Sequence, residues 1–344
     1  MTGFPALLDY ELPPHLIAQE PAAERDAARL LVVDRATGTL NHHHFRDLTD
    51  RLFSGDLLVL NDTRVLPARL VGRRARTGGK WEGLFLRSTA DGLWELLAQT
   101  RGHPTAGEVI IIEPGGLRLT LRGRLNGHWL AEPDPPGTPA ELLAKFGRVP
   151  LPPYIRKGQA GPADRERYQT VYARSDGSVA APTAGLHFTP AVLDSLRTRG
   201  VAIATVTLHV GLGTFESMKS DDPAQHRMHA EWGEVPAATV EAIRECKTRG
   251  GRVIAVGTTA TRALESAAAE GEIRPWTGET DVFIYPPYRF RVVQGLITNF
   301  HLPRTTLLLL VAAFAGPELV RTAYAEAIRK EYRFYSYGDA MLMR

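Results

Sequence analysis

Hydrophobic and polar residues alternate along this chain in two different ways. In its second quarter, short runs alternate apolar and polar positions and are separated by Gly, Asp, Asn or Pro: ARLVGRRA, KWEGLFLR, LWELLAQT, VIIIEP, LRLTLRGRL and HWLAEP. Alternation at such close, regular spacing predicts antiparallel strands that close into a small barrel. We therefore expect a β-barrel domain at 66–148, inserted between the two parts of a main domain, 1–65 and 149–344.

The remaining sequence alternates helix-like and strand-like segments. Near its start, LLVVDR and LNHHHF read as a strand pair, and a helix then leads to the strand DLLVLNDTR. After residue 150, helices beginning at Pro190, Pro236 and Ala260 alternate with the strands VAIATVT and RVIAV. DVFIY, RFRVV and LITNF are strand-like, and two helices precede the C-terminal segment. This order predicts an α/β main domain with helices around a mixed sheet that is at least partly parallel.

Composition places the chain among ordinary globular proteins. It has 344 residues, 44% of them hydrophobic and 23% charged, with a formal net charge of +3. The single cysteine, Cys246, excludes an internal disulfide and fits a reducing compartment. Residues 1–14 lack the pattern of a signal peptide, and the longest apolar run, 307–315, is too short to span a bilayer. We expect a cytoplasmic protein that does not bind membranes.

Several common catalytic motifs are absent from the sequence. No GxGxxG follows a predicted strand, and there is no P-loop, GxSxG or HExxH sequence. These absences argue against dinucleotide-binding enzymes, P-loop hydrolases, serine hydrolases and zinc proteases. The run His42–His44 suggests a metal site, but one strand face supplies at most two ligands and no partner cluster is near in sequence. We expect no metal.

Polar loops follow four of the predicted strands, where ligand sites of α/β sheets lie. They contain Asn61, Asp62, Thr63 and Arg64; His209, Gly211 and Gly213; Gly257, Thr258 and Thr259; and Asn299 and His301. A fifth loop, Gly177–Thr189, presents His187 among small residues just before a helix capped by Thr189 and Pro190. Each feature also has an ordinary structural explanation: a buried histidine, a helix cap, or a surface ion pair between Arg262 and Glu265.

Basic residues cluster on both sides of the predicted barrel. The first cluster has no acidic residue between its members, which are Arg64, Arg69, Arg73, Arg74, Arg76 and Lys80. The second contains Asp164 and Glu166 among its basic residues, which are Lys145, Arg148, Arg156, Lys157, Arg165, Arg167 and Arg174. Such clusters are typical of a surface that binds RNA phosphates, and equally of a solvated basic face.

Taken together, the loops resemble one known family, the S-adenosylmethionine:tRNA ribosyltransferase-isomerases of queuosine biosynthesis. The segments that carry the resemblance follow the family order over nearly the whole chain, the barrel matching least; they include GDLLVLNDTRVLPARL, DRERYQTVYA, GSVAAPTAGLHFT, TLHVGLGTF, RMHAEW, GGRVIAVGTTATRALES and LITNFHLPRTTLLLLVAAFAG. The resemblance implies that the ribosyl part of S-adenosylmethionine is transferred to a 7-aminomethyl-7-deazaguanine at the tRNA wobble position. Isomerisation then gives epoxyqueuosine, with release of adenine and methionine.

This reaction assigns hypothetical roles to the polar residues. His187, His209 and His229 form an acid–base pool because the imidazole pKa lies near neutrality, and Glu231 orients an imidazole or binds the substrate ammonium. The others fall into three groups: Thr258, Thr259 and Arg262 for the substrate carboxylate; Asp62, Arg64, Asn299 and His301 in the cleft; Arg69, Arg73, Arg74, Arg156 and Lys157 for tRNA. S-adenosylmethionine is a substrate, no other cofactor or metal is implied, and we expect a monomer.

Two other functions compete with this interpretation. An S-adenosylmethionine-dependent RNA methyltransferase needs a glycine-rich nucleotide turn that the sequence lacks. A non-catalytic RNA-binding protein that uses the barrel leaves the polar strand-end loops without a purpose. Product analysis separates the three functions.

Overall fold

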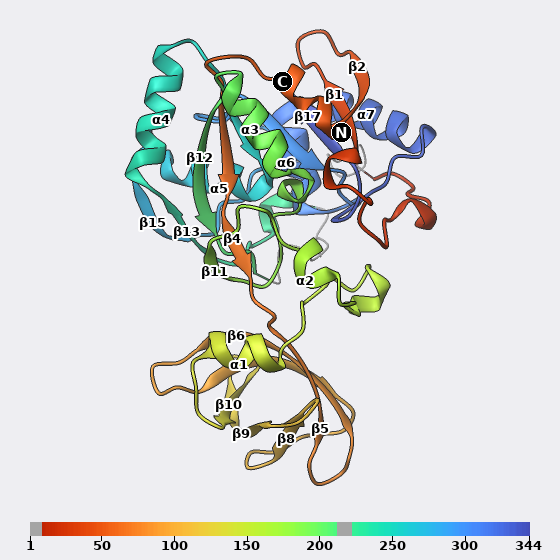
Figure 1. The fold of residues 1–344 in the computed structure, drawn as a ribbon, viewed down its shortest axis with the longest axis vertical. Helices are drawn as coiled ribbons and strands as arrows, with labels where there is room; N and C mark the ends of the chain where they lie inside the picture. The colour runs from red at the N-terminus through yellow and green to blue at the C-terminus, as the bar shows by residue number, and fades with distance from the viewer. Residues whose placement is uncertain (1–8, 212–221) are drawn as a thin grey trace. The chain divides into compact units, whose positions relative to one another are not determined.

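The computed structural model describes residues 9–211 and 222–344. The chain forms two compact units, one made of Met1–Arg64 with Gln169–Arg344 and the other of Val65–Tyr168. Figure 1 shows the first as helices around a large sheet and the second as a barrel of strands.

A nine-stranded mixed sheet forms the centre of the first unit. Its strands, in spatial order, are β15 (Trp276–Thr280), β13 (Glu231–Val235), β12 (Ala202–Leu208), β3 (Leu57–Asn61), β14 (Val253–Val256), β16 (Gly295–Asn299), β17 (Ala340–Met343), β1 (Arg29–Val33) and β2 (Leu40–His44). Strands β12, β3, β14 and β16 run parallel, whereas β17 is antiparallel to β16 and parallel to β1. The predicted mixed sheet is confirmed.

Helices cover both faces of this sheet. One face packs against α3 (Pro190–Thr198) and the 3-10 helices η4 (Phe45–Asp50) and η6 (Thr183–His187); the other packs against α4 (Ala237–Thr248), α5 (Gly257–Ala267), α6 (Thr306–Ala315) and α7 (Pro317–Arg329). Strand β3 shows why the sequence is apolar at consecutive positions. Leu58 and Leu60 face one layer and Leu57 and Val59 the other, so no position faces water.

The second unit is a closed antiparallel barrel, as predicted. Its strands are β5 (Arg69–Arg74), β6 (Lys80–Ser88), β7 (Trp94–Thr100), β8 (Val109–Ile112), β9 (Leu117–Leu125) and β10 (His128–Asp134), in the order β10-β7-β6-β5-β8-β9. Alternate side chains such as Trp81 and Trp94 fill its interior. Helix α1 (Pro139–Phe146) follows the last strand.

This unit extends to Tyr168, beyond the expected end at residue 148. Arg148 forms a β-bridge with Arg69 of β5, and the Arg69 guanidinium donates to the carbonyl of Gly158. Further along, Arg165 of helix α2 (Asp164–Arg167) donates to the carbonyl of Ala144 in α1. These hydrogen bonds hold residues 149–168 to the barrel rather than to the sheet.

Two strand predictions were wrong. DVFIY and RFRVV are not strands, because Pro286 and Pro287 between them have no N–H to donate to a sheet and the flanking aromatic residues pack on the core instead. The helix expected before Gly55 is present, as the 3-10 helix η4. Strands β13, β15 and β17 were not predicted. A short pair, β4 (Thr63–Val65) with β11 (Ser175–Ser178), lies beside the main sheet.

Across the described ranges, no single helix combines the length and apolarity needed to cross a membrane. Helices α6 and α7 meet that criterion only as a pair bent by 114°.

Candidate active site

A small pocket lies at the N-terminus of α5, where parallel strands of the main sheet end. Its lining comes from four loops: Ala181, Pro182, Thr183 and Ala184; Val210; Gly257, Thr258 and Thr259; Thr298, Asn299 and His301, together with Leu307. The pocket thus brings together four of the predicted substrate-binding residues, Thr258, Thr259, Asn299 and His301. The cavity measures about 30 Å³, which is room for one small polar group.

The first turn of α5 supplies hydrogen-bond donors to this pocket. Gly257 has φ +87°, and a Cβ there would approach the Thr259 hydroxyl at 3.5 Å and Ala184 Cβ at 3.7 Å. The N-cap residue is Val256, whose side chain cannot accept a hydrogen bond from the helix. The buried Thr259 Oγ1 has no hydrogen-bond partner among residues 9–211 and 222–344. Uncapped N–H groups and a free hydroxyl favour an anionic ligand.

Asn299 presents an acceptor to the same pocket. Its Nδ2 donates to His187 Nε2 at 3.2 Å and to the Tyr335 carbonyl at 3.1 Å, which determines how the amide is oriented. Its buried Oδ1 has no hydrogen-bond partner in the described part of the chain. A ligand in the pocket therefore meets donors at α5 and an acceptor at Asn299.

His187 lies behind the pocket wall rather than in it. The ring is 5% exposed and packs on Phe45, with the ring centroids 5.1 Å apart. Burial lowers the pKa of His187 to about 4, against an opposing effect of Asp339. Neutral His187 accepts from Asn299 through Nε2, so its position suits orientation of the Asn299 amide.

His301 is also neutral. Burial lowers the pKa of His301 to about 3, and its Nε2 lies 2.7 Å from Thr298 Oγ1. The backbone N–H of His301 donates to the Tyr324 hydroxyl. His301 is therefore a polar wall of the pocket that does not carry a proton at neutral pH.

His209 lies beside the pocket, and within the described residues its Nε2 has no hydrogen bond. Its Nδ1 lies 2.8 Å from Thr63 Oγ1, and its ring stacks on Trp232 at 5.0 Å. Nε2 faces Gly177, where a Cβ would come within 2.6 Å. Burial lowers the pKa of His209, whereas Asp62 and Asp176 act in the opposite direction. The next residue, Val210, lines the pocket.

Glu231 and Arg262 pair with each other, and neither belongs to the lining of the pocket. The carboxylate of Glu231 pairs with the Arg262 guanidinium and accepts from the Gly211 N–H at 2.7 Å, while Arg262 Nε donates to the Val282 carbonyl. Both side chains are 3% exposed. The alternative of a surface pair between Arg262 and Glu265 is excluded, because Glu265 is buried and accepts from the N–H groups of residues 291–293.

The remaining predicted residues lie apart from the pocket. His229 is exposed, just before β13. Asp62 is buried and accepts from Arg174 and Thr207 at 2.7 Å each. Arg64 is exposed, with its Nε 3.8 Å from Asp176. Gly213 lies outside the described residues.

The predicted tRNA contacts all lie in the barrel unit, and one of them is unavailable. Arg74 is 7% exposed and forms two hydrogen bonds with Glu108, at 2.6 and 2.8 Å. Arg74 therefore holds the barrel together. Arg73 and Lys157 are exposed, while Arg69 and Arg156 are half-buried and paired with Glu82 and Asp164.

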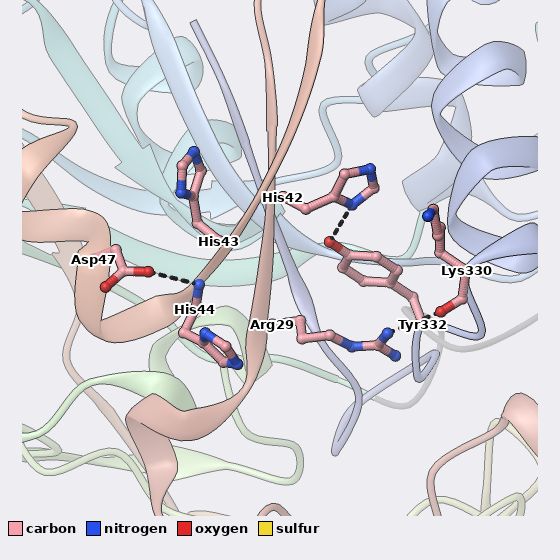
Figure 2. Close-up of a pocket in the computed structure, with 7 residues that line it drawn as sticks. All are labelled: Arg29, His42, His43, His44, Asp47, Lys330 and Tyr332. Carbon is pink, nitrogen blue, oxygen red and sulfur yellow. Dashed lines mark hydrogen bonds between the residues drawn. The ribbon is translucent and has the colours of Figure 1, made fainter.

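The three consecutive histidines of β2 line a different pocket (Figure 2). His42 lies between the Tyr332 hydroxyl, at 2.8 Å, and Glu326, at 3.2 Å. Within the described residues, no group of three or more His, Cys, Asp or Glu side chains is arranged to hold a metal ion.

A pocket at the carboxyl edge of an α/β sheet, with donors and an acceptor converging in it, is typical of an enzyme that binds a small polar substrate. The family model described as "Queuosine biosynthesis protein" matches residues 6–343. The chain belongs to this family, which confirms the resemblance and the enzyme class.

Individual relatives agree with this assignment. Proteins named S-adenosylmethionine:tRNA ribosyltransferase-isomerase from Azoarcus sp. and Citrifermentans bemidjiense are 54% and 51% identical to this chain. The alignments cover 97% of this chain, with 96% and 98% of the relatives. A crystal structure of S-adenosylmethionine tRNA ribosyltransferase from Thermotoga maritima is 39% identical, with a TM-score of 0.57, and the match covers 98% of this chain and 100% of that one.

Proposed function

We propose that this protein transfers the ribosyl part of S-adenosylmethionine to a 7-aminomethyl-7-deazaguanine at the tRNA wobble position. Isomerisation of the transferred group gives epoxyqueuosine in tRNA, and adenine and methionine are released. S-adenosylmethionine is then a substrate, and the proposed reaction uses no further cofactor and no metal. We propose that the enzyme acts as a cytoplasmic monomer. Family membership and the pocket at α5 support this function.

The observation that carries the proposal is the pairing of unused donors and an unused acceptor in one cavity. The methionine end of S-adenosylmethionine has a carboxylate and an ammonium on the same carbon. The carboxylate suits the first turn of α5 and the hydroxyls of Thr258 and Thr259. The ammonium, one atom away, suits Oδ1 of Asn299. The cavity of about 30 Å³ has room for one small polar group, so the rest of the substrate lies outside it.

Within the acid–base pool of His187, His209 and His229, we assign the general base to His209. The sulfonium acidifies the neighbouring C5′ hydrogens, and the base must be neutral and have a free nitrogen to remove one. His209 meets both requirements, because burial lowers its pKa and Thr63 holds its other nitrogen. His187 acts through Asn299 as a positioning residue. Glu231 and Arg262 position Gly211, two residues after His209.

Product analysis tests the proposal. Labelled S-adenosylmethionine is incubated with wobble-modified tRNA, and nucleosides and small molecules are then separated. Epoxyqueuosine with adenine and methionine supports the transferase, whereas S-adenosylhomocysteine indicates a methyltransferase. Binding of tRNA without turnover indicates a non-catalytic RNA-binding protein.

The histidine assignment is tested by the variants His187→Ala, His209→Ala and His229→Ala, each assayed for adenine release. We expect the largest loss in His209→Ala, by roughly 10²–10⁴-fold, as is typical for removal of a general base. Adenine release within tenfold of the wild type in all three variants would contradict the acid–base assignment.

A further inference from the structure

The pocket beside β2 is larger than the one at α5 and has no part in the reaction described above. It measures about 360 Å³, within the size range of small-molecule sites. Its lining is rich in cationic and imidazole groups: Arg29, His42, His43, His44, Asp47, Lys330 and Tyr332 (Figure 2). Strand β2 is the last strand of the sheet, so the pocket lies at its edge.

Most charged groups around this pocket already have partners. The Arg29 guanidinium lies 4.2 Å above the Tyr332 ring, pairs with Asp339, and donates to the carbonyls of Lys330 and Glu331 at the end of α7. The Asp47 carboxylate accepts from the His44 N–H, as Figure 2 shows. Glu326 lies between His42 and Arg329. The carboxylates are thus engaged within the protein.

One group that suits an anion remains available. Lys330 is exposed, and its ammonium has no hydrogen bond or ion pair within the described residues. The His44 ring is exposed as well, although it also takes part in the capping box of η4 with Asp47. Arg29 stays 34% exposed at its side chain and adds a fixed positive charge next to them. An open pocket with these groups suits a phosphate.

Sheet register places this pocket near the candidate active site. Asn299 pairs with Ala340, Ala340 with Leu30, and Leu30 with His43. Three strand spacings of ~4.8 Å therefore separate Asn299 from His43, which is roughly 15 Å measured across the strands at one end of the sheet. Phe45, which follows His44, contacts the ring of His187, the partner of Asn299.

We propose that the β2 pocket binds a phosphate group, and that in the working complex this is a backbone phosphate of tRNA close to the target nucleotide. The inference rests on the proposed function for the identity of the RNA. The pocket lies at the C-terminal end of α7 and beside the N-terminus of the short 3-10 helix η4, where the Asp47 carboxylate already accepts from the N-cap N–H of His44. That helix end therefore has its own anion and is not free to enclose a phosphate. An open rim with a free lysine instead suits a phosphate that belongs to a longer chain.

Charge reversal tests the inference. Lys330→Glu is compared with Arg321→Glu, an equal charge change on the exposed face of α7, where Arg321 pairs with Glu318 and with no other carboxylate of the described residues. We expect Lys330→Glu to raise the Kd for tRNA about tenfold at 0.1 M salt. It should also make the negative slope of log K against log salt shallower by about 1. Arg321→Glu should change neither quantity, and the KM for S-adenosylmethionine should stay constant in both variants.

The outcomes separate this inference from the proposed function. Equal tRNA affinity in Lys330→Glu and Arg321→Glu overturns the inference. If inorganic phosphate shifts the His44 ring resonances by NMR while Lys330→Glu leaves tRNA binding unchanged, the pocket binds free phosphate and the RNA assignment is wrong. Wild-type protein that binds tRNA through Lys330 but releases no adenine overturns the proposed function and supports the inference. Circular dichroism confirms that each variant is folded.

Discussion

At the scale of single residues, the candidate site is defined by polar atoms that the protein does not use itself. Buried hydroxyl and amide oxygens are normally hydrogen-bonded, because an unpaired one costs roughly 1–3 kcal/mol. Thr259 Oγ1 and Asn299 Oδ1 have no partner among the described residues, and both belong to the lining of one cavity. A substrate that forms hydrogen bonds with both atoms would offset this cost.

Thr259→Val tests this directly, because valine keeps the shape and removes only the hydroxyl. We expect the KM for S-adenosylmethionine to rise about tenfold, which corresponds to the loss of one hydrogen bond of ~1.4 kcal/mol. The free energy of unfolding should stay constant or increase. The control is Thr261→Val, whose hydroxyl donates to the Gly257 carbonyl at 3.0 Å. It should lower stability slightly and leave KM unchanged; an unchanged KM in Thr259→Val would exclude this hydroxyl from the site.

At the scale of elements, the loop Gly177–Thr189 has small residues because the chain passes close to other side chains there. A Cβ at Gly177 would lie 2.6 Å from His209 Nε2, and one at Gly185 would lie 2.0 Å from the Tyr172 hydroxyl. Between these two glycines, Ala181–Ala184 form a wall of the pocket. Close packing on both sides thus sets the position of the wall.

Gly185→Ala should displace this loop and lower the free energy of unfolding by about 1–3 kcal/mol, as overpacking does. The Tyr172 hydroxyl has no partner among the described residues, so Tyr172→Phe alone should be nearly neutral. Combined with Gly185→Ala, it removes the closest clash and should restore at least half of the lost stability. A double-mutant cycle by urea unfolding measures this coupling, and an equal cost of Gly185→Ala in both backgrounds would contradict it.

At the scale of the whole molecule, the two units have different proposed roles, one in binding the substrate groups and the other in binding tRNA phosphates. The sheet unit contains the α5 and β2 pockets, and the barrel contains Arg69, Arg73, Arg156 and Lys157. We propose that these barrel residues bind tRNA phosphates. Arg73 and Arg74 are neighbours in sequence but face opposite sides of β5, since side chains alternate along a strand.

Arg73→Glu should leave the barrel folded and weaken tRNA binding, with a smaller salt dependence, because Arg73 is exposed and its pairing with Glu113 is a surface contact. Arg74→Glu should instead lower the melting temperature of the barrel, because two carboxylates would then face each other where Arg74 now meets Glu108. Thermal melting and tRNA titration at several salt concentrations distinguish the two effects. Unchanged tRNA affinity in Arg73→Glu would remove Arg73 from the interface.

Local patterns were sufficient to predict most of the architecture. Period-two alternation predicted the six barrel strands, and the apolar runs of β3, β12, β14 and β16 predicted the core of the sheet. Strand-end loops also indicated where Thr258, Thr259, Asn299 and His301 would gather. Each of these inferences depends on residues that are neighbours in sequence, where hydrophobic period and turn chemistry act.

Partnerships between distant residues were decided only by the tertiary structure. Glu231 meets Arg262, His187 meets Asn299, and β17 enters the sheet between β16 and β1, although nothing in their local sequence selects these partners. The same packing decided which histidines are neutral, since burial lowers the pKa of His187 and His301. His229, by contrast, lies at the surface. The sequence alone determined the family and the fold class, because these depend on local patterns. The use of each polar side chain depends on which distant groups surround it, and only the folded chain brings those groups together.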